Sequence, residues 1–300
     1  TLGKIPANRE IIDVIAHAYK LDGQDNIKDP IGMTGTRLEI DAHVVSALTP
    51  YIVNVDKVAE AAQVQPHAIV PTSMAAAKAV LSESQLENGV AVIDLGGATT
   101  SIAVYEEGDL QFVGVVPVGG ANITNDLAIG LKTDPEVAEE VKKKHACALS
   151  HAENSEVSIK HGGETHTFKT EEINEIVEAR LEEIFEAIQR ELKRAGRAGK
   201  LPSGVVLVGG ASKLKHIADY AKETLGLAAR LGQPTGFGGV AEDIDKAEYA
   251  TAIGLMLIDA EGLSRGENRS SKQGSGGGFK APSAKNIKGK ATKLFGFFKP

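Results

Sequence analysis

Apolar runs that end in glycines alternate along this chain with segments whose apolar residues recur at helical spacing. The runs at 89–97 and 204–212 each predict a buried strand that leads into a tight turn. The clearest helix is Thr170–Arg194, in which apolar residues recur about every 3.6 positions. Strands and helices of this kind, mixed along one chain, predict an α/β fold.

The other predicted elements are shorter. Asp134 followed by Pro135 is a helix start signal. Residues 101–120 are expected to form two strands around a turn at Gly108-Asp109, and 155–168 a hairpin around Gly162-Gly163. An extended segment is predicted at 36–56, and helices are predicted at 56–63, 72–82, 123–131, 134–145 and 247–257.

The C-terminal segment differs in character from the rest. Residues 263–284 are rich in serine and glycine and predict a flexible linker. In 285–300 the apolar residues span about 100° of a helical wheel, with lysines around them, which predicts a helix that lies on an anionic membrane surface. A solvated basic tail is the alternative, but it would need no aromatic residues. The candidate membrane-binding residues are Lys285, Ile287, Lys288, Lys290, Ala291, Lys293, Leu294, Phe295, Phe298 and Lys299.

Composition narrows the function further. The 300 residues suffice for about two domains, and the net charge of −7 argues against non-specific nucleic-acid binding. The single cysteine, Cys147, excludes a disulfide framework and argues against a Cys/His zinc site. No apolar run reaches 18 residues, so no helix is expected to span a membrane.

Two segments, VIDLGGATTS (92–101) and VLVGGASKL (206–214), share one design: an apolar strand followed by Gly-Gly. Such a turn lets the backbone approach a ligand and direct N–H groups at phosphate. Asp94 at the strand end could bind Mg²⁺ through water. Each segment alone is more typical of a tight turn in an α/β sheet than of a nucleotide site.

Further along, Gly119-Gly120 precedes a helix, and Glu139 and Lys142 share one helix face. The charged pair alone is more typical of a solvated surface salt bridge than of contacts to a ribose and an adenine.

In this order the motifs resemble the nucleotide-binding fold of actin, Hsp70 and the sugar kinases. The segments DGQDNIKDPIGMTGTRLE (22–39), PVGGANITNDLAIGLKT (117–133), AEEVKKKHACAL (138–149) and LPSGVVLVGGAS (201–212) more closely resemble the FtsA family of bacterial cell division proteins. The resemblance covers nearly the whole chain. It implies an actin-like (ribonuclease H-like) α/β fold that lacks its first phosphate-loop portion, with an inserted α+β subdomain and a C-terminal amphipathic helix.

The resemblance also implies a division into domains. The expected parts are an inserted SHS2-like subdomain (1–70), a remnant of the first actin-like domain (71–88), a second core subdomain (89–133 and 203–262), a peripheral subdomain (134–202), the linker (263–284) and the membrane-targeting helix (285–300).

The implied nucleotide site draws on all the glycine motifs. Ala98, Ser101, Ala121-Asn122 and Ala146 depart from the family pattern, which argues against a tight catalytic site but less against nucleotide binding. No catalytic residue is assigned. The residues expected at the nucleotide are Asp94, Gly96, Gly97, Ala98, Thr99, Gly119, Gly120, Asn122, Glu139, Lys142, Gly209, Gly210, Ala211 and Ser212, with Asp94 also holding Mg²⁺ through water.

Family members begin with a strand that carries a first phosphate loop, and the chain from Thr1 onward does not show it. We therefore expect half of the site to be missing, ATP binding to be weak or absent, and no ATPase activity. The full-length protein is expected to bind ATP or ADP with Mg²⁺, with at most weak ATPase activity.

The function implied by the resemblance is that of a peripheral membrane protein. It would tether the FtsZ ring to the cytoplasmic face of the bacterial membrane at the division site, recruit other divisome proteins and self-associate into filaments under nucleotide control. The FtsZ C-terminal peptide is expected at Arg180, Lys193 and Arg194, although an ordinary charged helix face would look the same.

Three rival functions share this fold class. The first is a PilM-like scaffold of type IV pilus assembly, which leaves the Phe/Lys tail less well explained. The second is a sugar or carboxylate kinase, for which no substrate motif is found. The third is an Hsp70-type chaperone, which would need a substrate domain after residue 257, where too few residues remain.

Overall fold

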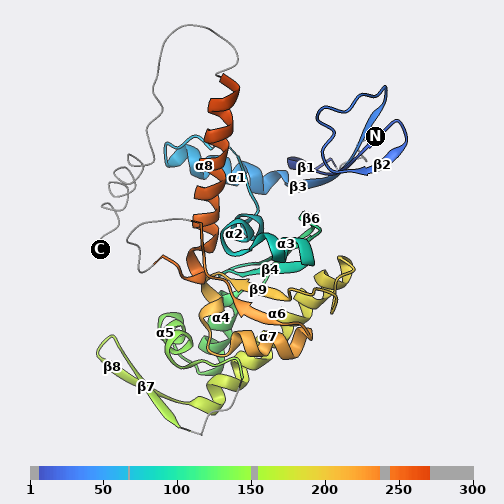
Figure 1. Cartoon of the computed structure of the whole chain (residues 1–300). Helices are drawn as coiled ribbons and strands as arrows, with labels where there is room; N and C mark the ends of the chain where they lie inside the picture. Colours follow the sequence, from blue (N-terminus) through green and yellow to red (C-terminus); the bar gives the residue numbers. More distant parts are fainter. Residues whose placement is uncertain (1–6, 67, 150–154, 237–243, 271–300) are drawn as a thin grey trace.

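The computed structural model describes residues 7–66, 68–149, 155–236 and 244–270 (Figure 1). Within these residues the strands form three sheets, of five, three and two strands. The five-stranded sheet is the centre of the molecule, and the two smaller sheets lie at its periphery (Figure 1).

The central sheet has the order β10-β9-β4-β5-β6. Its middle strand, β4, is fully buried, runs parallel to β9 and antiparallel to β5. Because Asp94 of β4 pairs with Val208 of β9, the carboxyl ends of these strands lie side by side. The two Gly-Gly turns therefore meet at one edge. The strands are β4 (Val90–Leu95), β5 (Thr100–Glu106), β6 (Asp109–Val116), β9 (Val205–Val208) and β10 (Ala229–Leu231).

Helices cover both faces of this sheet, which explains why β4 and β9 are rich in apolar residues. Ile93 and Leu207 face the larger core cluster, and Val92 and Val206 face the smaller one. The larger cluster holds α4 (Gly120–Gly130), α5 (Pro135–His145), α6 (Thr170–Arg194) and α7 (Ile217–Leu225). The smaller cluster holds α2 (Thr72–Val80) and α8 (Ala250–Ser270), and the short α3 (Glu83–Asn88) precedes β4.

The N-terminal part is a three-stranded antiparallel sheet in the order β2-β1-β3, followed by α1. It extends away from the central sheet (Figure 1). Lys28 and His17 contact Asp109 at the tip of the β5–β6 hairpin, at 3.2 Å each. The elements are β1 (Arg9–Leu21), β2 (Gln24–Ile27), β3 (Leu38–Leu48) and α1 (Thr49–Ala61); a separate hairpin comprises β7 (Glu156–His161) and β8 (Glu164–Lys169).

Two predicted boundaries need correction. The extended segment expected at 36–56 ends at Leu48, because Pro50 in the first turn of α1 starts the helix at Thr49. The linker expected from residue 263 is wrong over its first eight residues, since α8 continues to Ser270 despite Gly262 and Gly266. Residues 271–284 and the tail 285–300 lie outside the described residues. Among the helices described, none has the length and apolar content to cross a bilayer.

Candidate functional site

A cavity of about 810 Å³ opens where the two Gly-Gly turns meet the first turn of α4 and one face of α5. Among the described residues, every lining residue falls between Gly96 and Tyr249, so the cavity has walls from this part of the chain alone. Its lining consists of Gly96, Gly97, Gly120, Ala121, Ile123, Glu139, Lys142, Lys143, Ala146, Gly210, Ala211, Lys213, Leu214, Lys215, Glu248 and Tyr249.

The turns after β4 and β9 touch each other closely. Gly209 has φ +87°, and a Cβ there would lie 2.4 Å from a carboxylate oxygen of Asp94 and 2.6 Å from the carbonyl of Leu95. Only glycine combines a favourable positive φ with the lack of a Cβ that would overlap these atoms. Asp94 is buried, and its other oxygen accepts a hydrogen bond of 3.2 Å from Thr251. Asp94 therefore stands behind the cavity wall, held between the second turn and the start of α8.

The first glycine turn is tied to the N-terminus of α4. Gly120 N donates to the carbonyl of Gly96 at 2.9 Å, and Ala121 N donates to that of Gly97 at 2.8 Å. Asn122 completes the cap, since its side-chain oxygen accepts from Gly119 N at 3.0 Å. These three amide groups thus bind protein oxygens, and they fix the position of the turn rather than pointing into the cavity.

Lys142 of α5 connects α5 to the first turns of α4. Its Nζ donates to the carbonyl of Gly120 (3.0 Å), the hydroxyl of Thr124 (2.7 Å) and the carboxylate of Glu139 (2.5 Å). Burial of Glu139 opposes ionisation, but hydrogen bonds from Lys142 and Thr124 outweigh it and lower the pKa of this carboxyl. The pair is therefore a cavity wall that joins α5 to α4, which excludes the interpretation as a freely solvated salt bridge.

The tight turn predicted after the second apolar run takes the form of a 3₁₀ helix, Gly210–Lys213. Ser212 is buried and its hydroxyl donates to the carbonyl of Gly209 at 2.7 Å, so it closes the turn. Lys213 and Glu248 both line the cavity and form an ion pair at 2.6 Å. Four lysines and two glutamates line the cavity, which leaves it with a net positive charge suited to an anionic ligand.

The predicted nucleotide residues therefore divide into two groups. Gly96, Gly97, Gly120, Glu139, Lys142, Gly210 and Ala211 line the cavity. Asp94, Ala98, Thr99, Gly119, Asn122, Gly209 and Ser212 belong to the same turns but do not line it.

Sequence reasoning missed several lining residues. Lys213 and Lys215 lie three and five residues after the second Gly-Gly pair, and this proximity was an available signal. Glu248 and Tyr249 come from a distant segment and gave no local signal. In the described part of the chain, no three His, Cys, Asp or Glu side chains group as a metal site.

The predicted partner residues lie at two places on α6. Arg180 donates to both oxygens of Asp126 on α4, one of them at 3.0 Å, and to Glu183 at 2.6 Å. Lys193 and Arg194 follow more than three turns later, about 20 Å along the helix. There Arg194 pairs with Glu191 at 2.8 Å and lies over the ring of Phe112. The structure does not bring Arg180 together with the other two.

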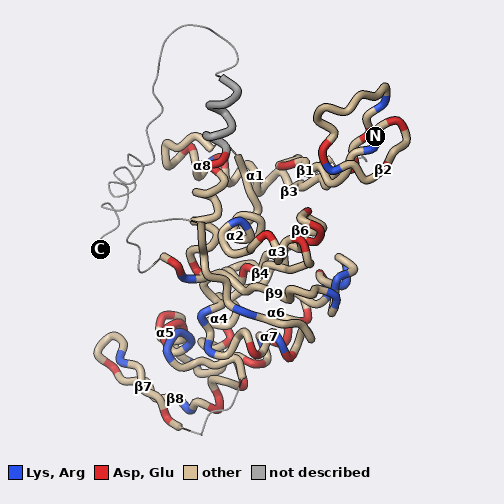
Figure 2. Tube along the Cα trace, viewed as in Figure 1, with Lys and Arg blue, Asp and Glu red and all other residues tan. Residues whose placement is uncertain are grey.

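Basic residues gather where α6 ends (Figure 2). This cluster, called here the α6 basic end, consists of Arg190, Lys193, Arg194, Arg197 and Lys200. Arg197 is already paired with Glu106, and Arg190 reaches Glu186 only at 3.7 Å. Lys193 is exposed, and no ion pair is recorded for it within the described residues.

Comparison with protein families gives two matches. The family model described as "Cell division protein FtsA" matches residues 91–254, and that of the "SHS2 domain inserted in FTSA" matches residues 2–46. The FtsA of Pseudomonas aeruginosa is 33% identical over 270 residues, which are 89% of this chain and 65% of that protein. The FtsA of Bacillus subtilis is 36% identical over 256 residues, 84% of this chain and 57% of that protein.

Solved structures share the fold. MreB5 of Spiroplasma citri bound to ADP superposes with a TM-score of 0.61 at 18% identity, over 74% of this chain and 68% of that one. The PilM-PilN type IV pilus biogenesis complex gives 0.61 at 19% identity, over 85% of this chain and 67% of that one. These likenesses show a mixed α/β actin-like fold.

Proposed function

Because the chain belongs to the FtsA family of cell division proteins, we propose that it acts as a peripheral membrane protein that tethers the FtsZ ring to the cytoplasmic membrane. The chain spans 65% and 57% of the lengths of the two relatives described above, so this function is proposed for the whole protein. The family match is the observation that carries the proposal. Recruitment of further divisome proteins and nucleotide-controlled self-association belong to the same proposal.

The tail supplies the membrane contact in this proposal. Residues 285–300 carry five lysines without an acidic residue, and three phenylalanines. Each lysine near an anionic leaflet contributes about 1 kcal/mol of binding free energy. The rival scaffold with a PilM-like fold has only the shared fold in its support, at 19% identity. The alternative function as a sugar or carboxylate kinase does not explain the lysines and phenylalanines of residues 285–300.

The cavity between the glycine turns is the proposed site of ATP or ADP with Mg²⁺. Its positive charge, its glycine walls and the Glu139–Lys142 pair suit a nucleotide. The likeness to an ADP-bound actin-like protein supports the same assignment. Asp94 is proposed to hold Mg²⁺ through water while one of its oxygens accepts from Thr251.

We expect this chain to bind Mg-ATP with a Kd above the micromolar range. Among the described residues, none before Gly96 lines the cavity, so a bound nucleotide would have no contact from the N-terminal part of this chain. Isothermal titration calorimetry of the 300-residue chain measures this directly. A Kd in the micromolar range or below would contradict the expectation and show that the described lining suffices for tight binding.

For FtsZ we propose that an acidic, apolar C-terminal peptide docks at the α6 basic end. Lys193 and Arg194 are its proposed contacts, because both side chains are exposed. Arg180 is the weaker part of the proposal, since its guanidinium is already engaged by Asp126 and Glu183. A peptide that used Arg180 would have to break this clamp.

The proposal is tested by reconstitution on vesicles. FtsZ polymers should sediment with phosphatidylglycerol-containing vesicles only when this protein is present. Lys193→Glu with Arg194→Glu should lower the affinity for the FtsZ peptide by about tenfold or more, because each reversal replaces attraction with repulsion. Vesicle binding of that variant should stay unchanged.

A matched control reverses two exposed lysines elsewhere, Lys160→Glu with Lys222→Glu. It changes the net charge equally and should leave FtsZ recruitment intact. Equal loss in both variants would mean that only overall charge matters. FtsZ that sediments no better with this protein than without it would reject the tether.

A further inference from the structure

Asp94 places a carboxylate in a row of apolar side chains. Alternate residues of a strand face opposite sides of the sheet, and Val90 and Val92 of β4 face the smaller apolar cluster, to which α2 and α8 contribute. Asp94 continues this row near the end of the strand and is only 8% exposed. The sequence therefore puts a negative charge on the side of the sheet that α2 and α8 cover.

The charge of Asp94 has no cationic partner within the described residues. Its carboxylate accepts a hydrogen bond of 3.2 Å from the Thr251 hydroxyl, and no ion pair with a lysine, arginine or histidine is recorded for it there. The first turn of α8 contributes only a partial positive charge. Because an ionised group that is buried without compensation is costly, this carboxylate suits a bound cation.

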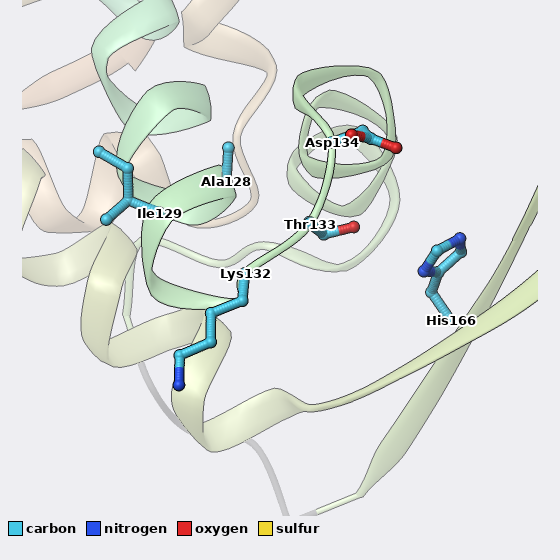
Figure 3. A pocket seen from close by; sticks show the side chains of 6 residues that line it. All are labelled: Ala128, Ile129, Lys132, Thr133, Asp134 and His166. Carbon is cyan, nitrogen blue, oxygen red and sulfur yellow. The ribbon is translucent and has the colours of Figure 1, made fainter.

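A carboxylate elsewhere in the fold shows the difference. Asp134 lies at a second cavity, of about 450 Å³, which shares no lining residue with the nucleotide cavity (Figure 3). Asp134 is exposed, so water solvates its charge without a cation. Asp94 is largely shielded from water, and a positive charge has to come from the ligand of the neighbouring cavity.

Two neighbours fix the direction of the Asp94 carboxylate. One oxygen lies against Gly209, where a Cβ would come within 2.4 Å of it. The other oxygen accepts from Thr251, the second residue of α8. The Thr251 hydroxyl has one proton and a second possible acceptor, the carbonyl of Thr72, at 3.4 Å. The hydrogen bond to the carboxylate is shorter, and its ionised acceptor makes it the stronger of the two.

Further contacts hold the start of α8 at the second glycine turn. Gly209 N donates to the carbonyl of Ala247, just before α8, at 3.0 Å. Lys213 pairs with Glu248, and both side chains line the cavity. Thr251 therefore belongs to a segment that is anchored at the proposed nucleotide site, although it does not line the cavity itself.

We propose that Thr251 is a positioning residue, which holds the Asp94 carboxylate in the orientation that binds the Mg²⁺ of a nucleotide through water. This inference rests on the proposed nucleotide site. A single carboxylate fits this metal, because Mg²⁺ keeps several waters and is held by one or two carboxylates together with phosphates. When bound, Mg²⁺ would neutralise the charges of the carboxylate and the phosphates. Thr251 restricts the carboxylate in advance, so less conformational entropy is lost on binding.

The test measures how strongly Mg²⁺ affects ATP binding. ATP is titrated to millimolar concentration into the ¹⁵N-labelled 300-residue chain, with excess MgCl₂ or with EDTA, and the amide shifts of Gly96, Gly97 and Gly210 give the Kd. The quantity compared is the Kd in EDTA divided by the Kd in Mg²⁺. Asp94→Asn should lower this ratio about tenfold, because it removes the charge that faces the metal.

Thr251→Val is the informative variant, because it removes the hydroxyl and keeps the shape of the side chain. It should lower the ratio about tenfold as well, the effect of one hydrogen bond to a charged group. Its Kd in EDTA should stay close to that of the unmodified chain, since no metal is then bound. Thr251→Ser keeps the hydroxyl and should restore the ratio.

Two matched controls should behave as the unmodified chain does. Thr235→Val removes another threonine hydroxyl that donates to a backbone carbonyl, that of Ala79 at 3.4 Å. Asp134→Asn removes a carboxylate that is exposed, and asparagine is an equally good residue before a helix.

The outcomes separate this inference from the proposed nucleotide site. ATP that shifts no amide of the glycine turns, with or without Mg²⁺, would reject the site and the inference together. ATP binding with an unchanged ratio in Thr251→Val, or with a ratio that Thr251→Ser fails to restore, would overturn the inference alone. A lower melting temperature of Thr251→Val with an unchanged ratio would assign the hydroxyl to the carbonyl of Thr72, a purely structural role.

Discussion

Substitution of Phe295 and Phe298 by glutamate should reduce binding to anionic vesicles by about a thousandfold or more. Both residues lie on the apolar stripe of the predicted tail helix. Burial of one phenylalanine in the acyl boundary contributes about 1.5–3 kcal/mol. Each new carboxylate near an anionic leaflet adds repulsion of about 1 kcal/mol. The combined change of about 5 kcal/mol exceeds three powers of ten in affinity. Co-sedimentation over a range of lipid concentrations measures it.

The control places the same two charges off the stripe, as Phe279→Glu with Phe297→Glu. On a helical wheel Phe297 lies about 100° from Phe298, and Phe279 belongs to the preceding serine- and glycine-rich segment. This control should lose only the electrostatic part, about 2 kcal/mol or some thirtyfold. Equal losses in the two variants would indicate a merely basic tail, and no loss in either would exclude the tail from membrane binding.

The central sheet was predictable from sequence because each strand and helix carries its own pattern of apolar residues. Strands such as β4 are rich in apolar residues when helices cover both faces of the sheet. Helix α6 is recognisable because apolar residues recur at helical spacing along its 25 residues. The N-terminal sheet was not predictable in the same way. Its strand β1 mixes half-buried and exposed positions irregularly, with register shifts near Asp13 and Ala18 that break the two-residue period.

The candidate site likewise has features that the sequence reveals and features that it does not. The glycine motifs were visible in the sequence, since a turn that meets a neighbouring backbone requires glycine. Their partners were not visible, because Thr251 reaches Asp94 across 157 positions and Lys142 reaches Gly120 across 22. Such contacts depend on the completed packing of α4, α5 and α8. Sequence therefore predicts which residues make the turns, and the fold decides which of them face the cavity.

Helices α2 and α8 pack so closely that a side chain added at Gly254 should strongly lower the free energy of unfolding. A Cβ at Gly254 would lie 1.7 Å from the carbonyl oxygen of Ala75 and 2.4 Å from its carbonyl carbon. These are backbone atoms, so no side-chain rotation relieves the overlap. Gly254→Val must therefore push the two helices apart and loosen the apolar cluster around Val92 and Val206.

We expect Gly254→Val to lower the free energy of unfolding by about 3–5 kcal/mol, a large part of the 5–15 kcal/mol typical of a domain. Urea titration followed by circular dichroism measures this. Ala252→Val, at an exposed position of the same helix, is the control and should cost less than about 1 kcal/mol. If both variants unfold at the same urea concentration, the close approach of the helices contributes nothing to stability.

The expected loss should extend to the site, because Thr251 lies one turn before Gly254 and donates a hydrogen bond to Asp94. A helix displaced at Gly254 therefore also releases the carboxylate behind the glycine turns.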